Sequence, residues 1–324
     1  MNVSRRRFIT VLGSSILMPL LPGCLRAGRP LTIASHVWPG YEFMFLARRE
    51  GWLPQKGLSL LETGSATDSI KALKAGTVDG AALTLDEVLR VREGGIPLTV
   101  VLVFDVSAGA DAVLARPGIN TPAELAGRRI GFEHSALGEL MLYKLLESGS
   151  LTTKSIIQVP LTPDSHMQAW KEERLDAVIT YEPELTKLEA DGAHRIFDSF
   201  SVPGIILDVL AVRTSELKKH STALEQLVLG HFRGLHHLKA NRQDAVHRIA
   251  PRLGIPAQNV LDAFRGLELP DIRTNLQYLG GSNPRIITSV RTLISLMLKA
   301  GLLKKGDDLT DICSDKYLPA GELP

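Results

Sequence analysis

The segment LTIASHVWPGYEFMFL at residues 31–46 predicts a β-strand over residues 31–37, followed by a helix that begins after Trp38-Pro39-Gly40. Further apolar segments predict strands at residues 58–62, 78–83 and 97–104. The helices between them begin at SATD (residues 65–68) and TLDE (residues 84–87), which have the spacing of capping boxes. This alternation predicts an α/β fold with a parallel sheet and helices on its faces.

The same pattern begins again after residue 110. Strands are predicted at residues 112–115, 129–133, 156–159 and 176–180, with a long apolar segment at residues 205–212. Helix starts are predicted at Thr121-Pro122, Ser135 and Thr162-Pro163. From residue 214 onward the apolar spacing is mostly helical. The repeated order predicts two lobes of similar build, which agrees with the length of 324 residues.

Composition and charge narrow the class of protein. The chain is 44% hydrophobic and 22% charged, which excludes a disordered chain, collagen or a coiled-coil rod. Two cysteines exclude a disulfide scaffold or a Cys-rich metal module. The formal charge is +2, and without the arginines at residues 5–7 the remaining charge is −1. The folded part therefore carries no basic surface of the kind that binds nucleic acid.

The N-terminus is predicted to be an export signal. Residues 1–23 hold a basic start and a short apolar stretch, and residues 4–9 (SRRRFI) resemble a twin-arginine signal, with ordinary Sec export as the alternative. Residues 21–24 (LPGC) resemble a lipobox in which Cys24 carries the lipid, ahead of a linker at residues 24–30. The other interpretation is a free cysteine beside an ordinary cleavage site. Lipidation predicts a periplasmic, membrane-anchored lipoprotein.

Candidate ligand contacts lie where the predicted strands end, because ligands of open α/β sheets bind beyond the carboxyl ends of the strands. Several of these ends are also predicted helix N-termini, whose free N–H groups can bind acceptor oxygens. The short catalytic motifs G-x-S-x-G, G-x-x-x-x-G-K-[ST], G-x-G-x-x-G and H-E-x-x-H are missing. The adjacent His236 and His237 would point about 100° apart on a helix, a poor geometry for one metal. We therefore predict no catalytic residue, cofactor or metal.

Several stretches carry a resemblance to a known family. They are WPGYE (residues 38–42), GSA (residues 64–66), the stretch ALKAGTVD (residues 72–79) and DAVITYEP (residues 176–183). In order and spacing they resemble the periplasmic solute-binding proteins of ABC importers, in the nitrate/sulfonate/taurine and thiamine-pyrimidine (NMT1/THI5-like) group. The resemblance implies a two-lobed type II fold with mostly parallel sheets, helices on both faces and the ligand in the inter-lobe cleft. It places residues 30–108 and 209–324 in lobe one and residues 109–208 in lobe two, with crossovers near residues 105–116 and 203–213.

The resemblance also implies ligand-binding residues. They are Trp38, Tyr41, Ser65, Thr84 and Asp86 in lobe one, Glu133, Ser135, Tyr181 and Glu182 in lobe two, and Asp105, Asp111 and Asp208 on or near the crossovers. Some of these side chains have structural alternatives. The hydroxyls of Ser65, Thr84 and Ser135 can act as helix caps, while Asp86 and Glu182 can be solvated acids at helix starts. Trp38 and Tyr41 can be packing residues of a loop.

The predicted site is rich in acids and has no Lys or Arg at the same strand ends, whereas sulfonate and nitrate sites need donors around an anion. We therefore predict a small ligand with cationic or N–H-rich character that pairs with carboxylates and stacks on Trp38 or Tyr41. The predicted function is capture of this ligand by hinge closure and delivery to the permease of an ABC importer, by a monomer. Two alternatives are a binding protein that feeds a membrane sensor and a pyrimidine-synthesising enzyme of the same fold group.

Overall fold

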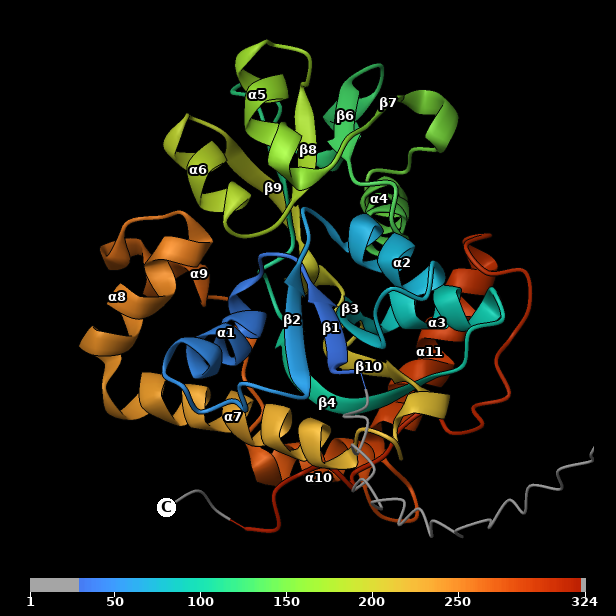
Figure 1. Cartoon of the computed structure of the whole chain (residues 1–324). Helices are drawn as coiled ribbons and strands as arrows, with labels where there is room; N and C mark the ends of the chain where they lie inside the picture. The colour runs from blue at the N-terminus through green and yellow to red at the C-terminus, as the bar shows by residue number, and fades with distance from the viewer. Residues whose placement is uncertain (1–28, 322–324) are drawn as a thin grey trace, which may run out of the picture.

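Two β-sheets, each enclosed by helices, form the two lobes of the molecule (Figure 1). The structure is a computed structural model that describes residues 29–321. The predicted signal peptide (residues 1–23), the lipidation at Cys24 and most of the predicted linker lie outside the described residues. The predicted two-lobed α/β architecture is confirmed.

The first lobe is built on a six-stranded sheet in the order β2-β1-β3-β10-β4-β11. β1 pairs with β2 and β3 in parallel, whereas β10 pairs with β3 and β4 in antiparallel, as does β11 with β4. The strands are β1 (Leu31–Ser35), β2 (Leu58–Glu62), β3 (Gly80–Thr84), β4 (Leu98–Ser107), β10 (Leu207–Arg213) and β11 (Leu267–Glu268).

The second lobe repeats this plan with five strands in the order β7-β6-β8-β5-β9. β6 pairs with β7 and β8 in parallel, and β5 pairs with β8 and β9 in antiparallel. The strands are β5 (Ala112–Ala115), β6 (Arg129–Phe132), β7 (Ile157–Pro160), β8 (Ala177–Thr180) and β9 (His194–Asp198).

Both sheets are mixed, but most strands of each sheet run in the same direction, as expected: β1, β2, β3 and β4 in the first sheet, and β6, β7, β8 and β9 in the second. In each lobe one crossover strand, β10 in the first and β5 in the second, lies between two strands that run the opposite way. β10 returns from the second lobe and β5 arrives from the first, so each enters its sheet from the end that faces the other lobe. Each insertion replaces one parallel pairing with two antiparallel ones.

Apolar side chains on both faces explain why helices cover both sides of each sheet. Along β10, Leu210 and Val212 join one core cluster while Val209 and Ala211 join the other, the alternation expected of a strand buried on both faces. The helices that supply the facing side chains are α1 (Glu42–Arg49), α2 (Ala66–Lys74), α3 (Leu85–Glu93), α4 (Ala136–Ser148), α5 (His166–Lys171), α6 (Glu184–Ala190), α7 (Ser221–Ala240), α8 (Arg242–Leu253), α9 (Val260–Ala263), α10 (Ile272–Leu279) and α11 (Arg285–Lys299).

The two crossings between the lobes lie side by side and are tied together. The chain leaves the first sheet after Ser107, enters the second at Ala112, and returns between Asp198 and Leu207. Ser199 Oγ, on the returning segment, lies 2.7 Å from Ser107 Oγ and accepts from Gly109 N at 2.7 Å. Between residues 29 and 321, no helix combines the length and the apolar character needed to cross a bilayer.

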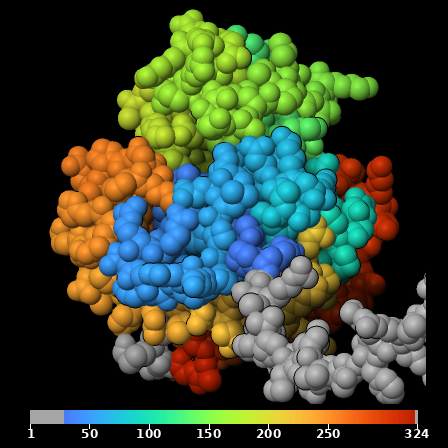
Figure 2. Space-filling view, viewed as in Figure 1, coloured from blue at the N-terminus to red at the C-terminus, as the bar shows by residue number. Residues whose placement is uncertain are grey.

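The lobes are closed on one another. In the space-filling view the green second lobe lies directly on the blue surface of the first (Figure 2). Arg90 of α3 forms an ion pair with Glu139 of α4, and Ala136 and Leu140 of α4 belong to the apolar cluster that contains α3. The strand ends of both lobes therefore face each other across a narrow gap.

Candidate functional site

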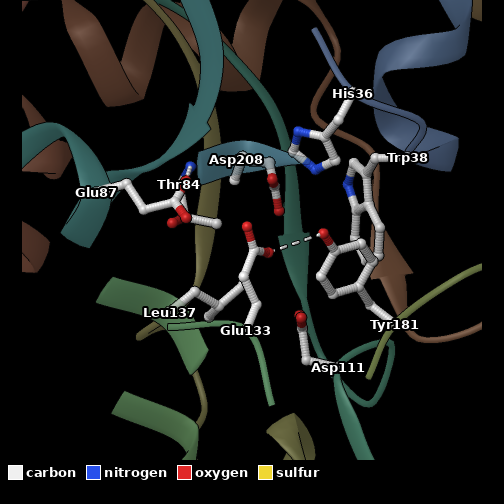
Figure 3. A pocket seen from close by; sticks show the side chains of 10 residues that line it. His36, Trp38, Thr84, Glu87, Asp111, Glu133, Leu137, Tyr181 and Asp208 are labelled. Atoms are coloured by element: carbon white, nitrogen blue, oxygen red, sulfur yellow. Dashed lines mark hydrogen bonds between the residues drawn. The ribbon is translucent and has the colours of Figure 1, made fainter. Parts of the chain in front are cut away.

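A small pocket lies between the lobes, where strand ends of the two sheets meet (Figure 3). Its empty volume, counted to the point where it opens to solvent, is about 270 Å³. The enclosed part has room for about one water molecule. Carboxylates dominate one part of the wall and aromatic rings the other. The lining residues are His36, Trp38, Ala66, Thr84, Glu87, Asp111, Glu133, Leu137, Tyr181 and Asp208.

The aromatic wall combines residues from both lobes. Trp38, which follows β1, packs edge-on against Tyr181, which follows β8, with ring centroids 5.6 Å apart. His36 lies 5.8 Å from the same tyrosine ring. Burial and the charge of Arg252 lower the pKa of His36 to about 3, so this imidazole is neutral at ordinary pH. The wall therefore offers flat, uncharged rings to a ligand.

Three polar residues form a row across the first sheet. Asp208 of β10 is in register with Thr84 of β3 on one side and with Asp105 of β4 on the other. Residues in register on neighbouring strands point to the same face, so these side chains are neighbours. Tyr41 donates its hydroxyl proton to Asp208 from behind the pocket.

Trp38 is held by the same row. Its indole N–H donates to Asp105 Oδ2 at 3.0 Å, and both side chains are buried. The turn that carries Trp38 can approach β4 only because Gly40 has no side chain: a Cβ there would lie 1.7 Å from Asp105 Oδ2. A glycine, a tryptophan and an aspartate thus position one aromatic face of the pocket.

Glu133 joins the two lobes at the pocket. It follows β6 in the second lobe, yet its Oε1 accepts from Thr67 N at 2.9 Å and from Thr67 Oγ1 at 2.6 Å in the first turn of α2. Its other oxygen, Oε2, accepts from the Tyr181 hydroxyl at 3.4 Å. Figure 3 shows the carboxyl groups of Glu133 and Asp208 pointing toward one another.

The carboxyl groups in and around this pocket are deeply buried. Asp86, Glu87, Asp105, Asp111, Glu133 and Asp208 are each at most 4% exposed. Neither oxygen of Asp86 has a hydrogen-bond partner among the described residues, and the same holds for one oxygen each of Glu87 and Asp111. No Lys or Arg of residues 29–321 lines the pocket. Such oxygens are costly to bury without donors.

Burial shifts the proton affinity of these acids upward. It raises the pKa of Asp105 and Asp111 to about 7 and that of Asp86 to about 6. Burial, together with the charges of neighbouring carboxylates, raises the pKa of Glu87 and Asp208 well above the usual range. The site therefore holds protons near neutral pH unless a cation replaces them.

The structure separates the predicted site residues into two groups. Trp38, Thr84, Asp111, Glu133, Tyr181 and Asp208 line the pocket, while Tyr41 and Asp105 stand directly behind its wall and Asp86 is buried close by. The remaining three do not line the pocket, and their side chains act as helix caps. Ser65 Oγ accepts from Asp68 N and Ser135 Oγ from Gly138 N, both at 3.2 Å, and Glu182 accepts from Thr186 N and Oγ1.

Four lining residues were not predicted: His36, Ala66, Glu87 and Leu137. His36 directly follows the last residue of β1, a position that the strand-end rule covers. The sequence predicts a capping box that ends at Glu87, and Glu87 Oε2 does accept from Thr84 N at 3.1 Å. Its Oε1 is free among the described residues and belongs to a pocket-lining side chain, so one residue serves both purposes. Nothing in the sequence distinguishes Ala66 or Leu137 from packing residues.

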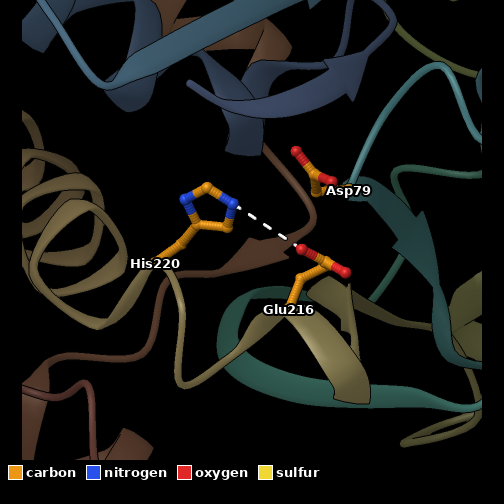
Figure 4. Close-up of side chains that lie close together, drawn as sticks. All are labelled: Asp79, Glu216 and His220. Carbon is orange, nitrogen blue, oxygen red and sulfur yellow. Dashed lines mark ion pairs between the residues drawn. The ribbon is translucent and has the colours of Figure 1, made fainter. Parts of the chain in front are cut away.

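A second group of ligating side chains lies just before β3 and just before α7 (Figure 4). One ligand atom from each of Asp79, Glu216 and His220 lies within 4.8 Å of the others. Arg29 occupies the cation position in this group: its guanidinium donates to both oxygens of Asp79 and lies 3.9 Å from Glu216. This arrangement is an internal ion-pair network. No three of the pocket carboxylates form such a close group within the described part of the chain.

Two mixed α/β sheets in the same order, two crossings and a pocket between the lobes define the class of two-lobed binding-protein folds. A family model described as "NMT1/THI5 like" matches residues 38–245. The chain belongs to the NMT1/THI5-like family. This confirms the resemblance found in the sequence.

Solved structures agree on the fold. The ligand-binding component of an ABC-type import system from Staphylococcus aureus, with zinc bound, has a TM-score of 0.71 at 15% identity, covering 89% of this chain and 98% of that one. The aliphatic sulphonate binding protein SsuA from Escherichia coli has a TM-score of 0.68 at 18% identity, covering 87% and 96%. The nitrate-binding protein NrtA from Synechocystis has a TM-score of 0.69 at 11% identity, covering 89% and 87%. No protein with a curated description matches the sequence.

Proposed function

We propose that this protein is a periplasmic solute-binding protein that captures a small cationic or N–H-rich molecule and delivers it to an ABC importer. The observation that carries the proposal is the set of buried carboxyl groups around the inter-lobe pocket, which has no Lys or Arg of residues 29–321 in its wall. Several of their oxygens lack a donor among the described residues. A ligand that brings N–H groups and positive charge supplies the missing donors.

The spacing of the acids favours an organic cation over a metal ion. A divalent ion needs several oxygens within one coordination sphere, and among the described residues no three of the pocket carboxylates bring an oxygen within 4.8 Å of one another. An amine, amidine or aminopyrimidine spreads its N–H groups over a wider span. Its flat face would lie against Trp38 and Tyr181, whose rings form the opposite wall.

The narrow pocket supports a mechanism of hinge closure. Its centre has room for about one water molecule, so a ligand of several heavy atoms enters only when the lobes separate. The two crossings between Ser107 and Ala112 and between Asp198 and Leu207 are the segments about which the lobes would turn. In the closed state the ligand contacts Asp208 from one lobe and Glu133 from the other. Closure thus adds contacts that neither lobe offers alone.

Export and anchoring form a second part of the proposal. The described chain begins at Arg29, five residues after Cys24, so a lipid on that cysteine would hold the first lobe within roughly 17 Å of the bilayer. Replacing Cys24 with alanine should move the protein from the membrane fraction to the soluble periplasmic fraction. Unchanged retention in the membrane fraction would exclude this anchor.

A thermal-shift screen tests the ligand class. Amines, amidines and aminopyrimidines form one arm, and taurine, nitrate and zinc chloride form the other. A ligand at 100 times its dissociation constant stabilises the folded state by about 2.7 kcal/mol. We expect such a shift from a member of the cationic arm, and we expect Asp208→Asn to abolish it. Glu182→Gln, which removes a buried acid outside the pocket, is the matched control and should retain the shift.

A further inference from the structure

The N-terminus of α2 is occupied by an acid that belongs to the other lobe. The first turn of a nine-residue helix has free N–H groups and favours negative charge. Thr67 N and Thr67 Oγ1 in that turn both donate to Glu133 Oε1, at 2.9 and 2.6 Å. Ala66, the first residue of the helix, lines the ligand pocket. The place where a solute anion would find donors therefore already holds a carboxylate of the chain.

A second donor of this helix turn, Asp68 N, also has an acceptor. Asp68 N donates to Ser65 Oγ at 3.2 Å. On the facing helix of the second lobe, Gly138 N donates to Ser135 Oγ at the same distance. These donors that flank the pocket thus have protein acceptors, and Glu133 is the acceptor that crosses between the lobes.

The two oxygens of Glu133 have different surroundings. Oε1 receives two short hydrogen bonds from Thr67, whereas Oε2 receives only the 3.4 Å contact from the Tyr181 hydroxyl, at the long limit of a hydrogen bond. Figure 3 shows the Glu133 carboxyl group directed toward Asp208. One oxygen thus fixes the side chain across the lobes, and the other leaves negative charge on the pocket wall.

We propose that Glu133 determines the charge selectivity of the pocket: by occupying the N-terminus of α2 from the opposite lobe, it excludes anionic solutes and requires a ligand that donates hydrogen bonds. The inference rests on the proposed function and deepens it by assigning the selection to one residue. At Thr67 and Asp68, a sulfonate, nitrate or carboxylate group would meet donors that already have acceptors, and it would also meet the negative charge of Glu133. An N–H group would meet Glu133 Oε2, an acceptor that receives only the long contact from the Tyr181 hydroxyl.

Calorimetric titrations of three variants test this assignment. Inorganic sulfate is the anionic probe and methylguanidinium the cationic probe. Glu133→Ala frees the donors of Thr67, and the isosteric Glu133→Gln removes only the charge. We expect sulfate affinity to rise by at least about tenfold in Glu133→Ala, the value of one charge-assisted hydrogen bond. We expect methylguanidinium affinity to fall by at least about tenfold in both variants. Glu182→Gln, an equally buried acid of the same lobe, should change neither affinity.

The outcomes separate the two proposals. Sulfate affinity in Glu133→Ala within about threefold of the wild type would overturn the role of Glu133, whatever methylguanidinium does. A gain of sulfate binding in Glu133→Ala, with no binding of any cation by the wild type, would support the role of Glu133 and contradict the cationic ligand. If Glu133→Ala does not fold, the isosteric variant decides. Loss of methylguanidinium affinity in Glu133→Gln, with the affinity retained in Glu182→Gln, would support the role of Glu133. Unchanged affinity in Glu133→Gln would overturn it.

Discussion

The indole nitrogen of Trp38 lies 3.0 Å from Asp105 Oδ2, and neither residue is more than 3% exposed. This hydrogen bond connects the loop after β1 to the strand that leaves for the second lobe. It sets the direction of the ring that packs against Tyr181 across the pocket. One ring of the aromatic wall is therefore positioned by Asp105, which does not itself line the pocket.

Replacing Gly40 with alanine should break this arrangement. The new Cβ would lie 1.7 Å from Asp105 Oδ2, so either the aspartate or the loop must move. We expect a loss of about 1–3 kcal/mol in the free energy of unfolding, together with weaker ligand binding. Chemical denaturation measures the first effect and calorimetry the second.

Gly64→Ala is the matched control, because Gly64 lies in the corresponding loop after β2. Its Cβ would meet Asp68 Oδ2 at 3.4 Å, an ordinary contact. A stability loss at Gly64 equal to that at Gly40 would show that the clash with Asp105 is not the cause.

Stability should fall as the pH rises from 6.5 to 8. The pKa values of Asp105 and Asp111 are about 7 in the folded protein, above the ordinary 3.8, so their stabilising protons are lost as the pH rises through 7. The buried His36 and His231 have pKa values lowered from 6.5 to about 3, so they make the folded state more stable as the pH rises toward 6.5. Above pH 6.5 they are neutral in both states and add no pH dependence. Denaturant titrations of the ligand-free protein should show a decrease on the order of 1–2 kcal/mol over this window.

Asp111→Asn should make that decrease smaller, because the amide carries no proton to lose. Asp308→Asn, whose side chain is 79% exposed, should leave the pH profile unchanged. A stability that rises from pH 6.5 to 8 would contradict the burial of protonated acids at this site.

Cation binding should release protons near pH 7. A positive ligand favours the ionised form of the carboxyl groups, whose pKa values burial has raised in the free protein. Affinity should therefore increase with pH between about 6 and 8. Calorimetry in phosphate and in Tris buffer measures the release, because the two buffers take up protons with different heats. Equal heats in both buffers, with a flat pH profile, would argue against the ionisation of these acids on binding.

His231 offers a test of the packing of the first lobe away from the site. It is fully buried beside Phe43, Phe104 and Phe232, and neither ring nitrogen has a hydrogen-bond partner among the described residues. His231→Leu should raise the free energy of unfolding by about 1 kcal/mol, because it removes two polar atoms that are buried without partners.

His166→Leu is the comparison for this change. His166 is equally buried, but its Nδ1 lies 3.0 Å from Thr180 Oγ1 in a hydrogen bond. Leucine there leaves the threonine hydroxyl without its partner, so the melting temperature should fall. A decrease at both positions would show that the ring of His231 contributes packing that leucine cannot replace.

The strands were predictable because local signals mark them. Residues 58–62 and 112–115 were placed correctly, and the helices after Ser65 and Ser135 begin where the capping residues predicted. The insertion of β10 between β3 and β4 was not predicted, since an apolar segment carries no information about which neighbours it joins. That insertion decides the site, because it puts Asp208 beside Asp105 and Thr84.

The sequence predicts that the site lies at the strand ends, but it does not tell which of the side chains there line the pocket. Hydroxyls at helix starts look alike in sequence, so Ser65 and Ser135 could not be separated as caps from Thr84, which lines the pocket. The contact of Glu133 with Thr67 depends on how the lobes close, which no local pattern encodes.

Calorimetric titration of the wild-type protein with cationic and anionic ligands at pH 7.5 tests the central claim most directly. We predict micromolar binding of an amine, amidine or aminopyrimidine, with no measurable heat from taurine or nitrate. Micromolar binding of either anion would contradict the account, because the carboxylates of the pocket would then face a ligand of their own charge.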